Sequence, residues 1–369
     1  MASDVFFSDT RARSGLSLID KITALFKAAN FNSLIDAGDF VALKLHIGEP
    51  GNLAFLPPPI VRRFVDLVSE CGGRPFVTDA NTLYIGARSN AIDHMKSAYL
   101  NGFTMETVGA PFIVADGLSG RDSQTVKFDG IKLKEAYIGS AIVEADVLIS
   151  LAHVKLHVMA GIGGAFKNVG MGAASRAGKR VQHAQFKPVV IQDACTGCKR
   201  CVKWCPANAI SINTTKKAYI NSELCIGCAE CMISCNFEAI ENRWSDGEDG
   251  SLQERMAEYT KAILSTKMNK KGFMNFLINI SPDCDCCNFN DAPIVANIGF
   301  LASTDPVAID QASADLINSA QPLVDSRLSH HMDAADRIKA LTGSNWEITL
   351  THAEKLGIGS RKYNLVKIK

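Results

Sequence analysis

Eight of the 12 cysteines fall into two copies of one motif. CTGCKRCVKWCP begins at Cys195 and CIGCAECMISCN begins at Cys225, so the spacing C-x2-C-x2-C-x3-C recurs after thirty positions. In bacterial-type ferredoxins, three closely spaced thiolates bind one [4Fe-4S] cluster and the fourth binds the other cluster. Crossed ligation therefore predicts two ligand sets: Cys195, Cys198, Cys201 and Cys235 for cluster 1, and Cys225, Cys228, Cys231 and Cys205 for cluster 2.

Zinc knuckles are the alternative for this repeat, because they also use Cys-x2-Cys pairs. A zinc site does not call for the Cys-Pro step at Cys205 and Pro206, which favours the ferredoxin interpretation. The second copy has Asn236 where the first has proline. Proline fixes the chain that leaves the fourth ligand, so this difference loosens the loop after Cys235 without removing a ligand.

Three further cysteines lie in SPDCDCCNFND, residues 281–291. Cys284 and Cys286 share one face of an extended chain, and Cys287 lies on the other face. Paired thiolates beside carboxylates can bind iron, zinc or a further cluster, so we predict an additional metal or redox site at Cys284 and Cys286. The alternatives are incidental thiols on a surface loop and a pair that oxidises to a disulfide.

Histidine and lysine alternate in two apolar segments, VALKLHIG and SLAHVKLH. Side chains two apart share a face of a strand, and open α/β sheets bind their ligands where strands end. We therefore expect these side chains to converge on one catalytic site, together with a lysine of the following glycine-rich segment. The candidates are Lys44, His46, His153, Lys155, His157 and Lys167.

Six glycines lie between Gly161 and Gly178 with basic residues among them. An amide-lined loop of this kind could bind an anionic group, and the alternative is close backbone packing. The spacing matches neither a Rossmann nor a Walker motif, so no nucleotide is specified. The candidate cofactor-binding residues are Gly161, Gly163, Gly164, Arg176 and Lys179, with Asp79 and Arg88 of DANTLYIGARSN as a second anion site or as part of a plain helix cap.

Apolar strands alternate with helical patterns along the rest of the chain. DFVALKLHIG, RPFVTDAN and ADVLISLAH are typical of buried strands, and PIVRRFVDLVSECGG follows the 3.6-residue period of a helix that ends at two glycines. This alternation predicts a layered α/β host domain, residues 1–187 plus 243–369. The host would be split by an inserted α+β ferredoxin-like two-cluster domain, residues 188–242.

Charge and hydropathy narrow the range of partners. A net charge of +1 gives no reason to expect nucleic acid or a membrane surface, and the apolar stretches are too short to span a bilayer. The N-terminus lacks an export signal, so we expect a cytoplasmic protein with reduced thiols. Acidic and basic side chains balance within residues 188–242, which favours electron exchange with the host domain over steering toward a charged partner.

Several of these segments together resemble one known family. LHIGEPGN, DANTLYIGARSNAIDHM, HVKLHVMAGIGGAFKNVGMGAASRAGK, the double cysteine motif, CDC and STDPVAID are similar to domain of unknown function 362, in the version with an inserted two-cluster ferredoxin domain. The resemblance implies an iron-sulfur protein of anaerobic or facultative prokaryotes, without a settled reaction. It also implies that the His, Lys, Gly-rich and CDC segments belong together.

The function expected from the sequence is that of a cytosolic iron-sulfur oxidoreductase, in which two [4Fe-4S] clusters pass electrons to or from a site in the α/β domain. One alternative is a non-enzymatic electron-transfer partner, and another is a scaffold for metal or cluster maturation. The expected partner is a redox protein or a small-molecule substrate, and a homodimer is compatible with the sequence.

Overall fold

The computed structural model describes residues 2–368, except for 85, 184–187, 227–230, 232–233, 236, 238, 243–250 and 332. Its centre is an eight-stranded sheet with the order β16-β1-β15-β14-β7-β2-β3-β4. Most neighbouring strands are parallel, and only β15 runs antiparallel to both of its neighbours. The strands are β1 (Ser3–Asp9), β2 (Phe40–Lys44), β3 (Arg74–Asp79), β4 (Phe112–Val114), β7 (Val147–His153), β14 (Lys271–Leu277), β15 (Gly299–Ser303) and β16 (Tyr363–Lys367).

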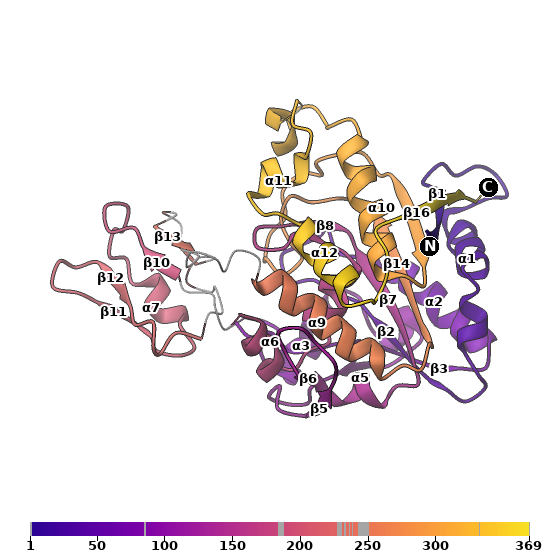
Figure 1. Cartoon of the computed structure of the whole chain (residues 1–369), viewed down its shortest axis with the longest axis horizontal. Coiled ribbons are helices and arrows are strands. Elements are labelled where there is room, and N and C mark those ends of the chain that lie inside the picture. The colour runs from indigo at the N-terminus through magenta and orange to yellow at the C-terminus, as the bar shows by residue number, and fades with distance from the viewer. Residues whose placement is uncertain are drawn as a thin grey trace.

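Helices cover both faces of this sheet and give a mixed α/β fold (Figure 1). On β2, Val41 and Leu43 belong to one apolar core and Ala42 to the other, because successive side chains point to opposite faces. The core of Val41 contains α1 (Leu18–Ala28), η1 (Phe31–Leu34), α2 (Pro58–Glu70), α3 (Ala91–Leu100) and α4 (Met105–Val108). The core of Ala42 contains α5 (Ser140–Glu144), α9 (Ser251–Ser265), α10 (Pro306–Ser319), η3 (Arg327–His331), α11 (Arg337–Thr342) and α12 (Glu347–Lys355).

The predicted helices and strands of this layered domain are confirmed, with boundaries shifted by a few residues. In α2, Ile60, Val61, Phe64 and Val68 are buried at the spacing of one helix face. The residue that precedes α10, Asp305, caps this helix, because its carboxylate accepts hydrogen bonds from the Val307 and Ala308 amides. Among the described residues, no helix is long and apolar enough to cross a bilayer.

Short elements between β7 and α9 shape the region near the sheet edge. They are β8 (Lys155–His157), which pairs with β9 (Gly161–Gly163), the π-helix η2 (Lys167–Met171) and α6 (Arg176–His183). A separate hairpin precedes them, β5 (Ser123–Lys127) and β6 (Glu135–Gly139). Together with α9, these elements place the histidine, lysine and glycine segments above the ends of β2, β3 and β7.

The described part of residues 188–242 forms elements apart from the main sheet, as Figure 1 shows. β10 (Pro188–Val190) pairs with β13 (Ile240–Asn242), and β11 (Ile210–Ile212) pairs with β12 (Ala218–Ile220), beside the short helix α7 (Arg200–Trp204). These elements share an apolar cluster of their own that includes Cys195, Cys201 and Cys231. Pro188 pairs with Asn242, so the two ends of the segment meet, as an inserted unit requires. Its identity as a ferredoxin-like domain and its exact boundaries stay a prediction.

Candidate functional site

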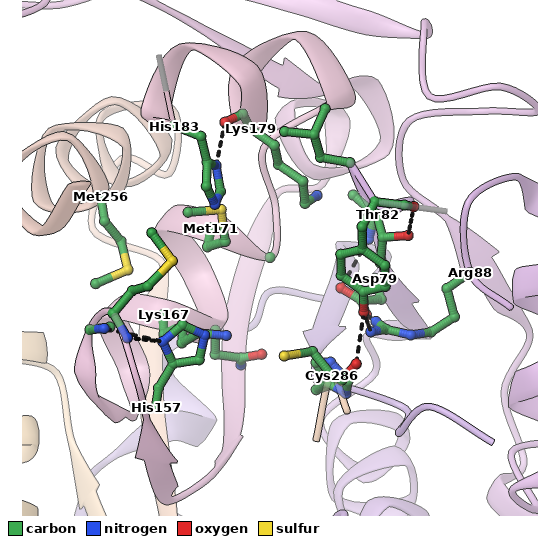
Figure 2. Close-up of a pocket in the computed structure, with 18 of the residues that line it drawn as sticks. Asp79, Thr82, Arg88, His157, Lys167, Met171, Lys179, His183, Met256 and Cys286 are labelled. Carbon is green, nitrogen blue, oxygen red and sulfur yellow. Dashed lines mark hydrogen bonds and ion pairs between the residues drawn. The ribbon is translucent and has the colours of Figure 1, made fainter. Parts of the chain in front are cut away.

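A cavity of about 130 Å³ lies where β2, β3 and β7 end (Figure 2). These strands are parallel, so their carboxyl ends bring residues from three distant segments to the same edge of the sheet. Nine of the residues selected from the sequence line the cavity: Lys44, His46, Asp79, Arg88, Lys155, His157, Lys167, Lys179 and Cys286.

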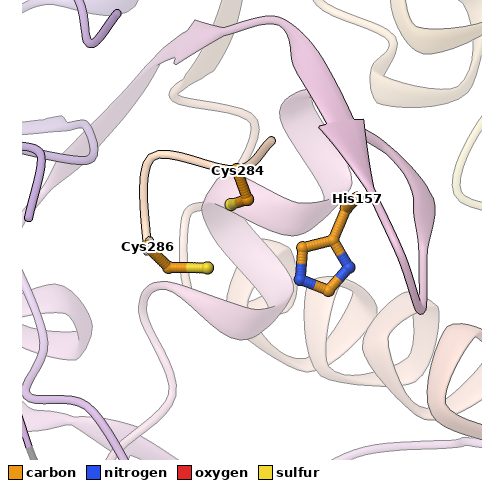
Figure 3. A group of neighbouring side chains, drawn as sticks. All are labelled: His157, Cys284 and Cys286. Atoms are coloured by element: carbon orange, nitrogen blue, oxygen red, sulfur yellow. The ribbon is translucent and has the colours of Figure 1, made fainter. Parts of the chain in front are cut away.

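His157, Cys284 and Cys286 form a group that could hold a metal ion (Figure 3). One ligand atom of each residue lies within 4.8 Å of those of the other two. His157 ends β8, and both cysteines come from the loop that follows β14. Thiolate and imidazole are ligands that zinc and iron accept, and three protein ligands leave one coordination position for another molecule.

Cys284 is buried and Cys286 is partly exposed. The hydrogen bond between Cys284 and Cys286, together with burial, raises the pKa of Cys284 well above that of an ordinary thiol. The hydrogen bond from Cys284 lowers the pKa of Cys286, but Cys287 and burial raise it, to about 11. Lys167 places its Nζ 3.3 Å from Cys284 Sγ. Because thiolates are the metal-binding form, a bound cation would release both protons.

His157 is held by two backbone donors. Its Nδ1 accepts hydrogen bonds from the Met159 and Ala160 amides, each at 3.1 Å. Burial lowers the pKa of His157 well below its usual value, so the ring is neutral and its proton resides on Nε2. Nε2 is therefore the nitrogen available to a metal, and binding at Nε2 would displace this proton.

The aspartate between the two cysteines fixes their loop. Asp285 is fully buried, and its carboxylate oxygens lie 2.8 Å from His153 Nδ1 and 2.7 Å from Lys155 Nζ. Burial alone would raise the pKa of Asp285, but His153 and Lys155 lower it, so the carboxylate stays charged. The second ring nitrogen of His153 bonds to the Ile278 carbonyl at 2.9 Å. His153 therefore does not line the cavity with Lys155 and His157: both of its ring nitrogens have partners, and it shares Asp285 with Lys155. Its catalytic role stays a prediction.

The opposite wall of the cavity holds a chain of buried ion pairs. Lys44 Nζ lies 3.0 Å from Asp79, and Arg88 bridges Asp79 at 3.3 Å and Glu49 at 2.7 Å. Tyr84 accepts a hydrogen bond from Arg88 and donates one of 3.1 Å to the Cys286 carbonyl. Arg88 is thus a buried structural cation. Through Tyr84, this network of ion pairs is hydrogen-bonded to the cysteine loop.

Four cysteines of residues 188–242 line a second, smaller cavity. Cys195, Cys198 and Cys201 of the first motif line it together with Cys235 of the second. The Ala218 amide donates to Cys195 Sγ at 3.4 Å, and the Ala209 amide donates to Cys205 Sγ at 3.2 Å. Amide donors of this kind are the usual outer contacts of cluster thiolates. Of the predicted cluster 2 ligands, Cys228 lies outside the described residues.

The sequence of residues 41–315 matches the model of a family described as domain of unknown function, DUF362. The chain belongs to the DUF362 family. No curated protein matches the chain.

Two solved structures are distantly similar. The lactate racemase apoprotein from Thermoanaerobacterium thermosaccharolyticum is 11% identical with a TM-score of 0.39, over 74% of this chain and 50% of that one. A protein from Thermotoga maritima is 10% identical with a TM-score of 0.39, over 72% of this chain and 52% of that one. The chain spans about half the length of each.

Gly161, Gly163 and Gly164 of this DUF362 chain pack closely and do not line the cavity. Gly161 and Gly163 lie in β9, and a Cβ at Gly164 would meet the Asp310 carboxylate at 2.3 Å. Asp310 accepts hydrogen bonds from the Ala165 and Phe166 amides, so the anion at this loop is the protein's own carboxylate. The expectation of an anion loop is therefore wrong for the three glycines. It is wrong for Arg176 as well, which lies outside the cavity lining, whereas Lys179 lines the cavity.

Glu49, Tyr84, Asn168 and Asp285 are among the residues of the site that the sequence analysis missed or left without a role. Glu49 and Tyr84 lie in irregular loops, where no periodicity indicates which way a side chain points. Asn168 lies in the π-helix and bonds Lys44 at 3.1 Å, a contact that only the packing of η2 on β2 creates. For Asp285, its position between Cys284 and Cys286 was the only feature of the sequence that could have indicated a role in the site.

Proposed function

We propose that this chain is a cytoplasmic iron-sulfur oxidoreductase, in which two [4Fe-4S] clusters in residues 188–242 exchange electrons with a site in the α/β cavity. The observation that supports it best is the cysteine cavity, in which Cys235 joins Cys195, Cys198 and Cys201. This is the crossed set that the ferredoxin spacing predicts. When bound, each cluster supplies or accepts one electron, so the pair matches a two-electron reaction.

The surroundings of these thiols fit a cluster. Gly197 has φ +69°, and a Cβ there would meet the Lys216 carbonyl at 2.1 Å, so only glycine allows the chain to turn this closely beside Cys198. Cys195 and Cys201 are buried, whereas Cys198 is exposed, which would leave one side of the group accessible to an electron partner. We expect that partner to be a redox protein.

In the α/β domain, the proposed reaction site is the group formed by His157, Cys284 and Cys286. These side chains would hold a metal ion, while Asp285 orients the cysteine loop through Lys155. A substrate would enter the cavity that His157, Cys286 and the lysines line together. Such a site needs no nicotinamide, because the electrons would come from the same chain.

A metal-handling scaffold is the second candidate, and the thiol-imidazole group is the observation that favours it. Such a protein would load an ion at Cys284 and Cys286 and pass it on, so metal binding would be reversible and need no electrons. A passive electron carrier is the remaining alternative. It would use the clusters alone and leave the α/β cavity without a role.

One experiment separates these functions. Anaerobically prepared protein should contain about eight irons and eight acid-labile sulfides, and should be reduced with titanium(III) citrate and freed of reductant. Adding the small-molecule fraction of a cell extract should then reoxidise the clusters, followed by their absorbance. A double variant, Cys284→Ser with Cys286→Ser, should remain reduced. Equal reoxidation of both proteins would contradict an oxidoreductase with this site and favour a carrier.

A further inference from the structure

The α/β cavity has two chemically different sides (Figure 2). On one side, Met171 and Met256 lie near His157. On the other, Asp79 and Arg88 lie beside Cys286. A ligand that fills the cavity must therefore match an apolar wall and a charged wall at once.

The apolar wall consists of flexible side chains. Met159, Leu252 and Met256 are 8%, 4% and 2% exposed, and Met171 packs against them. Methionine adapts to the shape of what it contacts, and its sulfur packs well on planar groups. This wall suits a small aliphatic or aromatic body and offers no hydrogen bonds of its own.

Five cations line the cavity, and four of them have a nearby partner among the described residues. Their contacts are Lys44 with Asp79 at 3.0 Å, Arg88 with Glu49 at 2.7 Å, Lys155 with Asp285 at 2.7 Å and Lys167 with Cys284 at 3.3 Å. Lys179 is the exception.

Lys179 is 6% exposed, and no described carboxylate lies within 4.0 Å of its Nζ. Its Nζ donates at 2.6 Å to the Ala174 carbonyl, which leaves two of its three donors for another acceptor. A buried ammonium group is costly unless an anion compensates it.

We infer that the cavity binds a small organic carboxylate, with its carboxylate group at Lys179 and its apolar body against the apolar wall. This deepens the proposed function, on which it rests for the reacting metal group. A cavity of about 130 Å³ holds roughly ten waters, so the ligand has about as many non-hydrogen atoms. The Ala165 and Phe166 amides of the glycine-rich segment, which could have bound a phosphate, are occupied by Asp310.

Benzoate and benzamide test this inference, because they have the same size and differ in charge. Each is titrated anaerobically, by calorimetry, into protein loaded with iron-sulfur clusters and Zn²⁺. Benzoate should bind at least tenfold more tightly than benzamide. Lys179→Met should weaken benzoate at least tenfold and leave benzamide unchanged, which also shows that the variant is folded. Lys179→Arg should keep the preference for benzoate, and Lys127→Met, at an exposed position of β5, should behave as wild type.

Two outcomes would overturn the inference. Equal affinity for benzoate and benzamide would show that the cavity does not select a carboxylate. Loss of benzoate binding in the variant with Cys284→Ser and Cys286→Ser would show that the carboxylate binds the metal and not Lys179. Reoxidation that does not depend on the cysteines would contradict the proposed function and leave the benzoate result standing. The two hypotheses therefore fail separately.

Discussion

The two cysteine-containing regions of this chain bring their side chains together over very different distances. In residues 188–242, three of the four cysteines around the smaller cavity lie three positions apart, and the fourth, Cys235, comes 34 positions after Cys201. In the α/β domain, His157 and Cys284 are more than a hundred positions apart and meet only because β7 and β14 are neighbours in the sheet. A local site depends on its loop, whereas a distributed site depends on the whole fold.

This difference has a consequence for folding. Residues 188–242, here called the cluster segment, have a small apolar core that includes Cys195, Cys201 and Cys231. Some of the thiols of this segment are therefore also packing residues. The α/β cavity lies beside two large apolar cores. Replacing its metal-binding side chains would leave these cores buried. We therefore expect cluster loss to disturb residues 188–242 and metal loss to leave the α/β domain folded.

The largest expected effect tests the crossed ligation of the local site. Cys235→Ala should remove the cluster held by Cys195, Cys198 and Cys201, so that bound iron falls from about eight to about four per chain. Iron analysis with paramagnetic resonance of the reduced protein measures this directly. Cys205→Ala is the matched variant and should remove the other signal. Cys198→Ala should remove the same signal as Cys235→Ala. If it removed the signal that Cys205→Ala removes, the crossed assignment would be wrong.

The second effect tests the distributed site. Cys284→Ser and Cys286→Ser should each reduce bound Zn²⁺ from about one ion per chain to near zero, because serine lacks the soft, ionisable sulfur. The iron content of residues 188–242 should not change. Cys287→Ser is the control, since Cys287 is outside the metal group. Competition with a chromophoric chelator gives the affinities, and equal losses in all three variants would contradict the assignment.

The sequence predicted the strands and helices well, because each depends on a local apolar period. It also predicted that Lys44 and His46 share the cavity. It did not predict that His153 lies outside the cavity lining, because β7 ends at this residue and β8 begins only at Lys155. The Val154 amide bonds to the Phe276 carbonyl of β14, a strand more than a hundred positions later. No local pattern reports such a contact.

The partners of the cavity lysines were beyond sequence reasoning for the same reason. Lys155 pairs with Asp285 and Lys167 lies at Cys284, and both contacts depend on where the loop after β14 crosses the edge of the sheet. The glycine segment was predicted to bind an anion, and Asp310 from α10 provides one. The sequence therefore indicated that an anion would lie at the glycine segment, but not that this anion would be the Asp310 carboxylate.

The third effect concerns stability in the distributed site. Asp285→Asn should reduce the free energy of unfolding by about 3–5 kcal/mol, because it leaves Lys155 as a buried cation without its charged partner. Urea denaturation of the metal-free protein measures this change. Asp283→Asn is the matched control two residues away. Asp283 pairs at 3.0 Å with the half-exposed Arg327, and a pair of this kind contributes about 1 kcal/mol or less. Similar losses in both variants would show that the Asp285 network has no special role.

The smallest effect concerns the charge of Lys179. Burial lowers the pKa of Lys179 to about 8, with Lys44 and Arg88 acting in the same direction and Asp116 and Asp79 against it. An unfolded lysine has a pKa of about 10.4. Between these values Lys179 binds more protons in the unfolded chain than in the folded protein, so the contribution of this group to stability rises with pH.

Lys179→Met should remove this rise, which for one group amounts to at most about 1.4 kcal/mol per pH unit. The measurement is the free energy of unfolding by urea at pH 8, 9 and 10 for wild type and variant, compared at each pH. Lys203→Met, at an exposed position in the cluster segment, should leave the slope of the wild type unchanged. A slope that persists in Lys179→Met would show that its ammonium group is already compensated in the folded protein, and a slope that falls equally in both variants would place the alkaline dependence outside the cavity.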